Sequence, residues 1–241
     1  MKISIVIPCI PRHFMQLHNV LQKLHDGTRV PDEVVVVLTE SNRIHVPLID
    51  SLREIGKTFF PSFVVVTLPH VTYSGPARQA GSVVSTGEVI IYQDADDIPH
   101  KQRVEVLEHF FNTTDALHIN HAYYHNVEAT SPPICIGDIH TVPSQTVFSR
   151  YFPTGSIAEC VKTTFSYGDN LGFTFPLIHV GATSVRREVL GQVSWKDVSN
   201  LSLVSDPGLR PRTEDYEFCM EVLHKFNRSL LLDAQLYYYY K

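Results

Sequence analysis

A chain of 241 residues is long enough to form one large α/β domain, or two small ones. The formal net charge of −5 and the lack of a run of lysine and arginine argue against non-specific binding of nucleic acid. The four cysteines lie far apart without a C-x-x-C pair, so they indicate neither a zinc site nor a dense disulfide framework.

The sequence indicates a cytoplasmic protein. Its amino-terminal apolar run is too short for a signal peptide, and we find no stretch of residues that could span a bilayer. The widely spaced cysteines also fit a reducing compartment.

Short runs of β-branched residues alternate with helix-like segments over residues 1–97. We expect strands at residues 3–8, 33–38, 63–68 and 89–92, and helices at 14–24, 48–55 and 76–86. The small residues Ala77, Ala80 and Gly81 indicate that the third helix lies close to a sheet. This alternation predicts an α/β fold with a mostly parallel central sheet and helices on both faces.

The remaining residues show a weaker pattern. Residues 127–176 are rich in proline, serine, threonine and aromatic side chains, and no element is predicted there. Elsewhere we expect a helix over 99–112, a strand over 116–125, a turn and short helix over 179–191, a loop over 205–212, a helix starting near 213 and a final strand over 230–240.

Three carboxylates follow the strand at residues 89–92. Asp94, Asp96 and Asp97 would repel one another unless a cation or hydrogen-bond donors balanced their charge. Carboxylate oxygens are hard ligands that suit Mg²⁺, Mn²⁺ or Ca²⁺. A calcium-binding loop is excluded, because the glycine at its sixth position and the glutamate at its twelfth are missing. The ordinary alternative is a solvated acidic turn.

The predicted sheet brings several strand ends together. Residues 8–12, Glu40 and residues 94–97 all follow parallel strands, whose carboxyl ends lie at one edge of the sheet. In open α/β folds the ligand binds at that edge. We therefore expect one site built from these three turns.

The order of these segments resembles the GT-A fold of the family-2 inverting glycosyltransferases. The resemblance is carried by residues 3–8, 77–81, 86–97, 181–187 and 213–215, which span most of the chain in the family's order. It implies a single GT-A (nucleotide-diphospho-sugar transferase) domain over residues 1–241. Within it, residues 1–97 would bind the nucleotide-sugar, and residues 98–241 would bind the acceptor and carry the catalytic base.

The resemblance also implies roles for single residues on the donor side. Asp94 and Asp96, with Ala95 between them, stand at the family's Asp-x-Asp motif. That motif holds the nucleotide ribose and the divalent metal on the diphosphate, with Asp96 as the metal ligand. Arg78 stands in the family's Ala-Arg-Asn turn near the donor nucleotide. Pro8, at the end of the first strand, is also expected to bind the donor.

Two positions depart from the family's pattern. Glu40 stands where the family commonly has an aspartate that reads the nucleobase, which leaves the donor open among UDP-, GDP- and dTDP-sugars. Gln79 replaces the usual asparagine. The ordinary alternatives are a surface salt bridge for Arg78 and a solvated strand-end acid for Glu40.

The catalytic base implied by the resemblance is Asp215, which follows Glu214 as in the family. Glu214, Gly181 and Trp195 are secondary candidates on the acceptor side. An acid in the first turn of a helix is also favoured by the helix dipole, which is the structural alternative for Asp215. His100 is the histidine nearest to the acids in sequence, and is the candidate for a further metal ligand.

Transfer of a sugar from a nucleoside diphosphate needs help at both ends of an in-line displacement. A metal, Mn²⁺ or Mg²⁺, stabilises the charge of the leaving diphosphate. A carboxylate takes the proton from the attacking hydroxyl of a glycan or other acceptor. We therefore predict an inverting, metal-dependent glycosyltransferase. The alternatives are a sugar-phosphate nucleotidyltransferase, whose usual glycine-rich loop is missing after the first strand, and a non-catalytic nucleotide-sugar-binding module.

Overall fold

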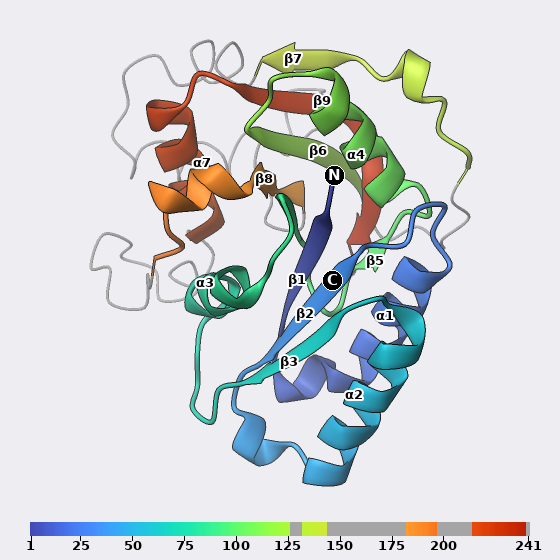
Figure 1. Cartoon of the computed structure of the whole chain (residues 1–241), viewed down its shortest axis with the longest axis vertical. Helices are drawn as coiled ribbons and strands as arrows, with labels where there is room; N and C mark the ends of the chain where they lie inside the picture. Colours follow the sequence, from blue (N-terminus) through green and yellow to red (C-terminus); the bar gives the residue numbers. More distant parts are fainter. Residues whose placement is uncertain (126–131, 144–181, 197–213, 240–241) are drawn as a thin grey trace.

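One curved sheet runs through the part of the chain that the structure describes (Figure 1). The structure is a computed structural model, and it describes residues 1–125, 132–143, 182–196 and 214–239. Those residues share a sheet of nine strands.

The first half of the chain alternates strands and helices. Its elements are β1 (Ile3–Cys9), η1 (Pro11–His13), α1 (Phe14–His25), β2 (Glu33–Leu38), η2 (Ser41–Arg43), α2 (Val46–Phe59), β3 (Phe63–Thr67), α3 (Ser74–Val84) and β4 (Val89–Tyr92). β1 pairs in parallel with β2 and β4, and β2 pairs in parallel with β3. Apart from a few end residues, these strands and α-helices match the predicted ones.

The second half extends the sheet with strands of mixed direction. Its elements are β5 (Ile98–Pro99), α4 (Arg103–Thr113), β6 (His118–His125), η3 (Ile136–Asp138), β7 (Thr141–Pro143), β8 (Ser184–Arg186), η5 (Arg187–Gly191), α7 (Glu214–Lys225) and β9 (Ser229–Tyr239). The strand order is β3-β2-β1-β4-β8-β6-β9-β5, with β7 paired to β9. The predicted α/β fold with a mostly parallel sheet is confirmed.

Two predictions about the second half were wrong. Pro99 does not begin a helix: it lies in β5 opposite Tyr237 of β9, and α4 begins at Arg103. β5 is an edge strand, where a proline is tolerated because its missing N–H faces no partner strand. The strand β8 lies where a turn was predicted, because three residues are too few to show a periodic pattern.

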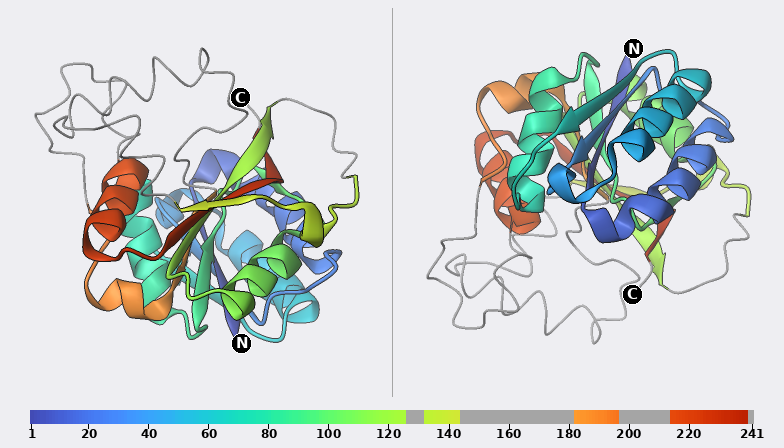
Figure 2. Two further views of the ribbon diagram at one scale, coloured as in Figure 1. Left: turned by 90° about the horizontal axis from the view of Figure 1, so that it is seen from above. Right: turned by 90° about the horizontal axis from the view of Figure 1, so that it is seen from below.

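Both faces of the sheet are covered by helices (Figure 2). Ile5 and Ile7 of β1 pack into a core that includes apolar residues of α1, α2 and α4. Val6 points to the opposite face, into a core shared with Ala77 of α3 and Phe218 of α7. Successive side chains of a strand point to opposite faces, so an unbroken apolar run is typical of a strand buried on both sides.

The helix α3 lies close against the sheet at Gly81. A Cβ atom added there would lie 2.4 Å from Val6 Cγ1 and 3.0 Å from Val37 Cγ2, so no larger residue fits without a shift of the helix. The prediction that small residues bring this helix onto the sheet is confirmed. The close approach also fixes the distance of Arg78, one turn earlier in α3, from the sheet.

The order of the parallel strands determines where a ligand can enter. β2 and β4 lie on opposite sides of β1, so the strand order reverses at the boundary between β1 and β4. Open α/β sheets bind ligands outside the carboxyl ends of the strands at such a reversal. The turns that follow these two strands carry residues 10–13 and 93–97.

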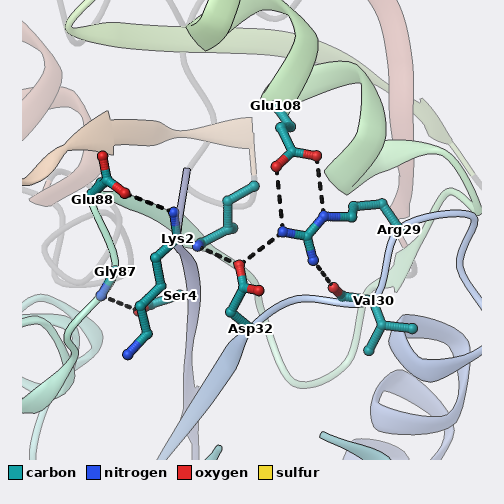
Figure 3. Close-up of polar contacts among 9 residues, drawn as sticks. Lys2, Ser4, Arg29, Val30, Asp32, Gly87, Glu88 and Glu108 are labelled. Atoms are coloured by element: carbon teal, nitrogen blue, oxygen red, sulfur yellow. Dashed lines mark hydrogen bonds and ion pairs between the residues drawn. The ribbon is translucent and has the colours of Figure 1, made fainter. Parts of the chain in front are cut away.

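The opposite end of the sheet is held by a network of charged side chains (Figure 3). The Arg29 guanidinium donates to Asp32 at 2.8 Å and to Glu108 of α4 at 3.1 Å. Asp32 also accepts the backbone amide of Ile3 at 2.8 Å. These contacts join the segment before β2 to β1 and to α4.

Glu33, at the start of β2, is 3% exposed and accepts three hydrogen bonds. They come from the Ser4 hydroxyl at 2.5 Å, the Thr86 backbone amide at 2.7 Å and the Thr86 hydroxyl at 2.9 Å. Burial raises the pKa of the Glu33 carboxyl, but these hydrogen bonds outweigh burial and lower it below its ordinary value. The folded protein therefore favours the charged form of Glu33.

We expect Glu33→Gln to lower the free energy of unfolding by about 1.5 to 3 kcal/mol at neutral pH, because hydrogen bonds to a charged group are lost. A carboxyl with a lowered pKa contributes stability above its unfolded-state pKa of about 4.3. That contribution is lost as the pH falls through the folded-state pKa. The difference between Glu33→Gln and the unmodified protein should therefore shrink in acid, as measured by urea unfolding at several pH values.

Glu54→Gln is the matched control on α2, where the Glu54 side chain pairs with Lys57 and is 73% exposed. An exposed ion pair contributes little, so this substitution should change the free energy of unfolding by less than about 0.5 kcal/mol. Equal effects of the two substitutions would contradict the role given to Glu33. So would a Glu33→Gln deficit that does not change with pH.

Candidate functional site

The turn after β4 is held by a buried glutamine and a buried arginine. The side-chain amide of Gln93 donates to the carbonyl oxygens of Asp94 at 2.9 Å and Asp97 at 2.8 Å. Arg103 of α4 donates to the Gln93 side-chain oxygen, and to the carbonyl of Tyr92 at 2.8 Å. The backbone that presents the acids is thereby fixed from within the fold.

Sequence reasoning missed both Gln93 and Arg103. Arg103 is 1% exposed, and burial lowers its pKa to about 10, so the guanidinium stays protonated at neutral pH. The signal that could have identified it is an arginine next to Val104 on the apolar face of the predicted helix. A buried charge in such a place needs carboxylates or carbonyl groups around it.

Arg78 of α3 connects the acids after β4 to the first turn of α7. Its guanidinium donates to Asp94 Oδ1 at 2.6 Å and lies 3.5 Å from Glu214 Oε1. The side chains of Arg78 and Glu214 are each 3% exposed, whereas that of Asp94 is 21% exposed. The arginine is therefore a buried part of the site and not a surface salt bridge.

Glu214, the first residue of α7, is buried against α3. The Ser74 hydroxyl donates to the Glu214 carboxylate, which also forms an ion pair with the Arg78 guanidinium. Burial raises the pKa of the Glu214 carboxyl, and Arg78 and Ser74 offset only part of that rise. A Cβ atom on Gly75 would lie only 3.3 Å from Glu214 Cβ. The amino-terminal turns of α3 and α7 are therefore in direct contact.

Trp195 lies in the same buried cluster. Its ring stacks on Phe218 of α7, with centroids 4.0 Å apart and planes 1° from parallel, and Arg78 Cζ lies 5.2 Å from its centroid. Its backbone amide donates to the Gln79 side-chain oxygen at 2.9 Å. A residue that is 3% exposed does not suit stacking against an acceptor sugar. Trp195 instead packs α7 against α3.

We expect Glu214→Ala to destabilise the protein by about 3 kcal/mol, because it removes a buried side chain that accepts from Ser74 and pairs with Arg78, and leaves a cavity in its place. Urea unfolding measures this loss. Glu221→Ala is the control on the same helix, since Glu221 pairs with Lys196 and Lys225, whose side chains are 54% and 40% exposed. It should cost less than about 1 kcal/mol. Similar costs for both substitutions would contradict a buried pair at Glu214.

Asp96 contacts the turn after β1, so the structure brings two of the three predicted turns together. Its Oδ2 lies 3.4 Å from Nδ1 of His13 in η1, and the two side chains are 31% and 19% exposed. The pKa of the Asp96 carboxyl is raised, first by burial and then by the charge of Asp94, while His13 and Arg12 offset part of the rise. Negative charge at Asp96 is therefore only partly compensated by the surrounding side chains.

The other predicted donor-binding residues lie at the ends of β1, β2 and β4. Pro8 is still within β1, opposite Val37, and is half-buried. Ala95 is buried between the two acids. Glu40 adopts a left-handed backbone conformation, with φ of 49°, and pairs with Arg43 at 2.5 Å. Glu40 thus has an arginine partner of its own, apart from the acids after β4.

Two predicted site residues lie at or beyond the limits of the described structure. Asp215 is the second residue of α7, directly after Glu214, and its side chain lies outside the described part. Gly181 lies outside the described residues altogether. Much of the predicted acceptor half does so as well, namely residues 126–131, 144–181, 197–213 and 240–241.

The sequence profile of glycosyl transferase family 2 matches residues 4–190. The chain belongs to this family. The match includes β1 to β4 and the turn with Asp94 and Asp96, as the resemblance read from the sequence implies. A sequence search of curated proteins gave no significant match.

Several solved structures share the fold of this family-2 chain. Residues 1–349 of S. aureus TarS in complex with UDP-GlcNAc align with a TM-score of 0.63 and 17% identity, over 100% of this chain and 59% of that chain. The mannosyltransferase PcManGT from Pyrobaculum calidifontis, in complex with GDP-Man and Mn²⁺, aligns with a TM-score of 0.61 and 11% identity, over 99% and 56%. Glucosyl-3-phosphoglycerate synthase from Mycobacterium tuberculosis, with Mg²⁺ and UDP, aligns with a TM-score of 0.52 and 14% identity, over 98% and 69%.

These likenesses confirm the predicted GT-A fold. The family-2 chain spans about 60% of the length of the TarS structures of residues 1–349. Within the described ranges, no helix has the length and apolar character that crossing a membrane requires.

The acids of this family-2 chain suit a hard divalent cation. Asp94 is paired with Arg78. Asp96 is a carboxylate that could hold a metal, and the charge of Asp94 is one cause of the raised pKa of Asp96. The described residues contain no group of three or more His, Cys, Asp or Glu side chains that could hold an ion by themselves. Mg²⁺ is usually bound by one or two carboxylates together with the phosphates of a substrate.

The contacts of His100 exclude it as the further metal ligand. Its Nδ1 accepts the backbone amide of Gln102 at 3.1 Å, and its Nε2 lies 3.1 Å from the carbonyl oxygen of Pro132. The residue is 3% exposed. Both ring nitrogens are used inside the fold, so nearness in sequence to the acids was a misleading signal.

Proposed function

We propose that the protein is an inverting, metal-dependent glycosyltransferase that moves a hexose or related sugar from a nucleoside-diphosphate sugar to an acceptor hydroxyl. The observation that carries the proposal is the buried link from Asp94 through Arg78 to Glu214. It joins the acids at the strand-order reversal to the helix turn that contains Asp215. Membership of glycosyl transferase family 2 supports the proposal.

The donor would bind outside the carboxyl ends of β1 and β4, beside Pro8 and Ala95. Asp94, oriented by Arg78, contacts the nucleotide ribose in this proposal, and Asp96 holds Mn²⁺ or Mg²⁺ on the diphosphate. The complexes of PcManGT with GDP-Man and Mn²⁺, and of the mycobacterial synthase with Mg²⁺ and UDP, support a nucleotide and a divalent cation as partners.

The residues around the acids hold in place the groups that would assist the departure of the nucleoside diphosphate. A bound divalent cation supplies a Lewis acid for the charge that develops on the leaving diphosphate. Asp96 would determine where the cation is held relative to the diphosphate. Gln93 and Arg103 fix the backbone of the turn that carries Asp96. Because these groups are in place before reaction, little reorganisation is needed in the transition state.

Asp215 would accept the proton of the attacking hydroxyl. Its backbone position is set by Glu214, whose buried contacts hold the first turn of α7 against α3. A single displacement with one base inverts the configuration at the anomeric carbon. Cys9 offers no thiolate for a covalent alternative, because burial and the charge of Asp96 raise its pKa to about 12.

A screen of UDP-, GDP- and dTDP-sugars for slow hydrolysis tests the proposal, and it also identifies the nucleobase and the sugar. We expect one donor to release its nucleoside diphosphate, with an inverted anomer seen by NMR, in Mn²⁺ but not in EDTA. Nucleotide binding without release would indicate the non-catalytic binding module instead. Pyrophosphate release from a nucleoside triphosphate and a sugar 1-phosphate would indicate a nucleotidyltransferase.

A further inference from the structure

We propose that His13, held by Arg12, is a positioning residue that orients Asp96 for the metal of the donor, an inference that rests on the function proposed above. His13 is not among the site residues predicted from the sequence. Its Nδ1 lies 3.4 Å from Asp96 Oδ2. It comes from the turn after β1, whereas Asp96 follows β4, so the contact crosses the strand-order reversal.

The contact with Arg12 determines which ring nitrogen of His13 carries the proton. Arg12 Nε donates to His13 Nε2 at 2.9 Å. A guanidinium N–H can only donate, so Nε2 offers its lone pair and the neutral ring carries its proton on Nδ1. Nδ1 is also the ring nitrogen that lies 3.4 Å from Asp96 Oδ2.

The backbone of η1 presents the ring to the acid. Pro11 lies in the first turn of η1, where its ring restricts the backbone, and the amide of His13 donates to the carbonyl of Ile10 at 3.0 Å. The His13 side chain is 19% exposed, so it is enclosed on most sides. A short side chain on a constrained turn can hold one orientation better than a long, exposed one.

The neighbours of Asp96 show what an N–H donor contributes here. Asp94 has Arg78 as its own partner, at 2.6 Å, and adds a like charge beside Asp96. An imidazole nitrogen 3.4 Å from Oδ2 restricts the rotation of the Asp96 carboxylate by direct contact and by its charge distribution. Because Nδ1 carries a proton, it has no lone pair for the metal, so His13 acts through Asp96 and not as a ligand.

The test is calorimetric binding of UDP and of GDP, each with and without Mn²⁺. His13→Leu removes both ring nitrogens, whereas His13→Asn keeps an N–H donor near the position of Nδ1. We expect His13→Leu to weaken Mn²⁺-dependent binding by about 10- to 100-fold, the usual effect of losing a group that supports a metal ligand. His13→Asn should recover most of the loss. Metal-free binding should stay the same in every variant.

Two further variants make the test specific. His18→Leu is the control, because His18 is an exposed histidine on α1 outside the site. It should leave both kinds of binding unchanged. Arg12→Met removes the group that directs the His13 proton to Nδ1, at an exposed position whose substitution leaves the core intact. It should give a smaller loss, confined to Mn²⁺-dependent binding, and this keeps the test open if His13→Leu does not fold.

The other outcomes each contradict the inference, and the pattern of binding shows which part of it is wrong. If the unmodified protein binds both nucleotides independently of Mn²⁺, the proposed metal step and this inference fail together. If its binding depends on Mn²⁺ but the His13 and Arg12 variants bind equally well, the inference alone fails. Equal losses with and without metal would show that His13 only shapes the turn. A directly bonded nitrogen in the electron spin echo of bound Mn²⁺ would show that His13 is a ligand.

Discussion

Asp215→Asn is expected to lower the transfer rate by roughly 10²- to 10⁴-fold, the usual contribution of a positioned general base. Asparagine keeps the shape of the side chain and the start of the helix but cannot accept the proton of the acceptor. Donor affinity should barely change, because we assign donor binding to Asp94, Asp96 and Arg78. Turnover with the donor found in the screen, and calorimetric affinity for that donor, measure the two effects separately.

Glu217→Gln is the matched control, because Glu217 is a half-buried acid in the same first turn of α7. If Asp215 only served the helix dipole, either substitution would cost at most about 1 kcal/mol of stability and leave turnover nearly intact. Melting curves of both variants check their folding. Near-normal transfer by Asp215→Asn would falsify the assignment of the base.

Asp96→Asn should abolish the metal dependence of nucleotide binding. The amide keeps the size of the side chain but loses the negative charge that attracts a hard cation. Affinity for a nucleoside diphosphate in Mn²⁺ should fall by more than about 100-fold, which is the upper range for residues that merely support a ligand. It should then equal the affinity of the unmodified protein in EDTA. Calorimetry in Mn²⁺ and in EDTA gives all four values.

Asp50→Asn is the control for charge alone, because the Asp50 side chain on α2 is 61% exposed and lies outside the site. It should bind nucleotide in Mn²⁺ as the unmodified protein does. Equal affinity of the unmodified protein in Mn²⁺ and EDTA, matched by Asp96→Asn, would remove the metal assignment and leave Asp96 a role in shaping the turn.

The part of the fold that could be predicted from the sequence is the part with local causes. The apolar run of β1, with Ile5 and Ile7 facing one core and Val6 the other, is unbroken because both faces are buried. The acids after β4 could be located because a strand of known direction delivers them to a known edge. Gly81 indicated a close helix for a similar local reason.

The contacts that shape the site could not be predicted because they join distant segments. Ser74 and Glu214 lie 140 positions apart, and nothing near either residue indicates the other. His13 and Asp96 meet because β4 lies beside β1, a fact about strand order that the periodic pattern does not contain. Pro99 was misassigned for a similar reason, since its strand exists through pairing with the last strand of the chain.

The contacts of Arg78 with Asp94 and Glu214 matter when segments are exchanged between related proteins. Arg78 lies within residues 1–97 and Glu214 within residues 98–241, and their side chains form a buried ion pair. A hybrid that joined residues 1–97 of this chain to the second half of a relative would inherit the arginine, but it would gain the carboxylate only if that relative has an acid at the matching position. Without it, the buried guanidinium of Arg78 would lose the carboxylate that Glu214 provides here. Suitable crossover partners are therefore better chosen by this pair of positions than by overall identity.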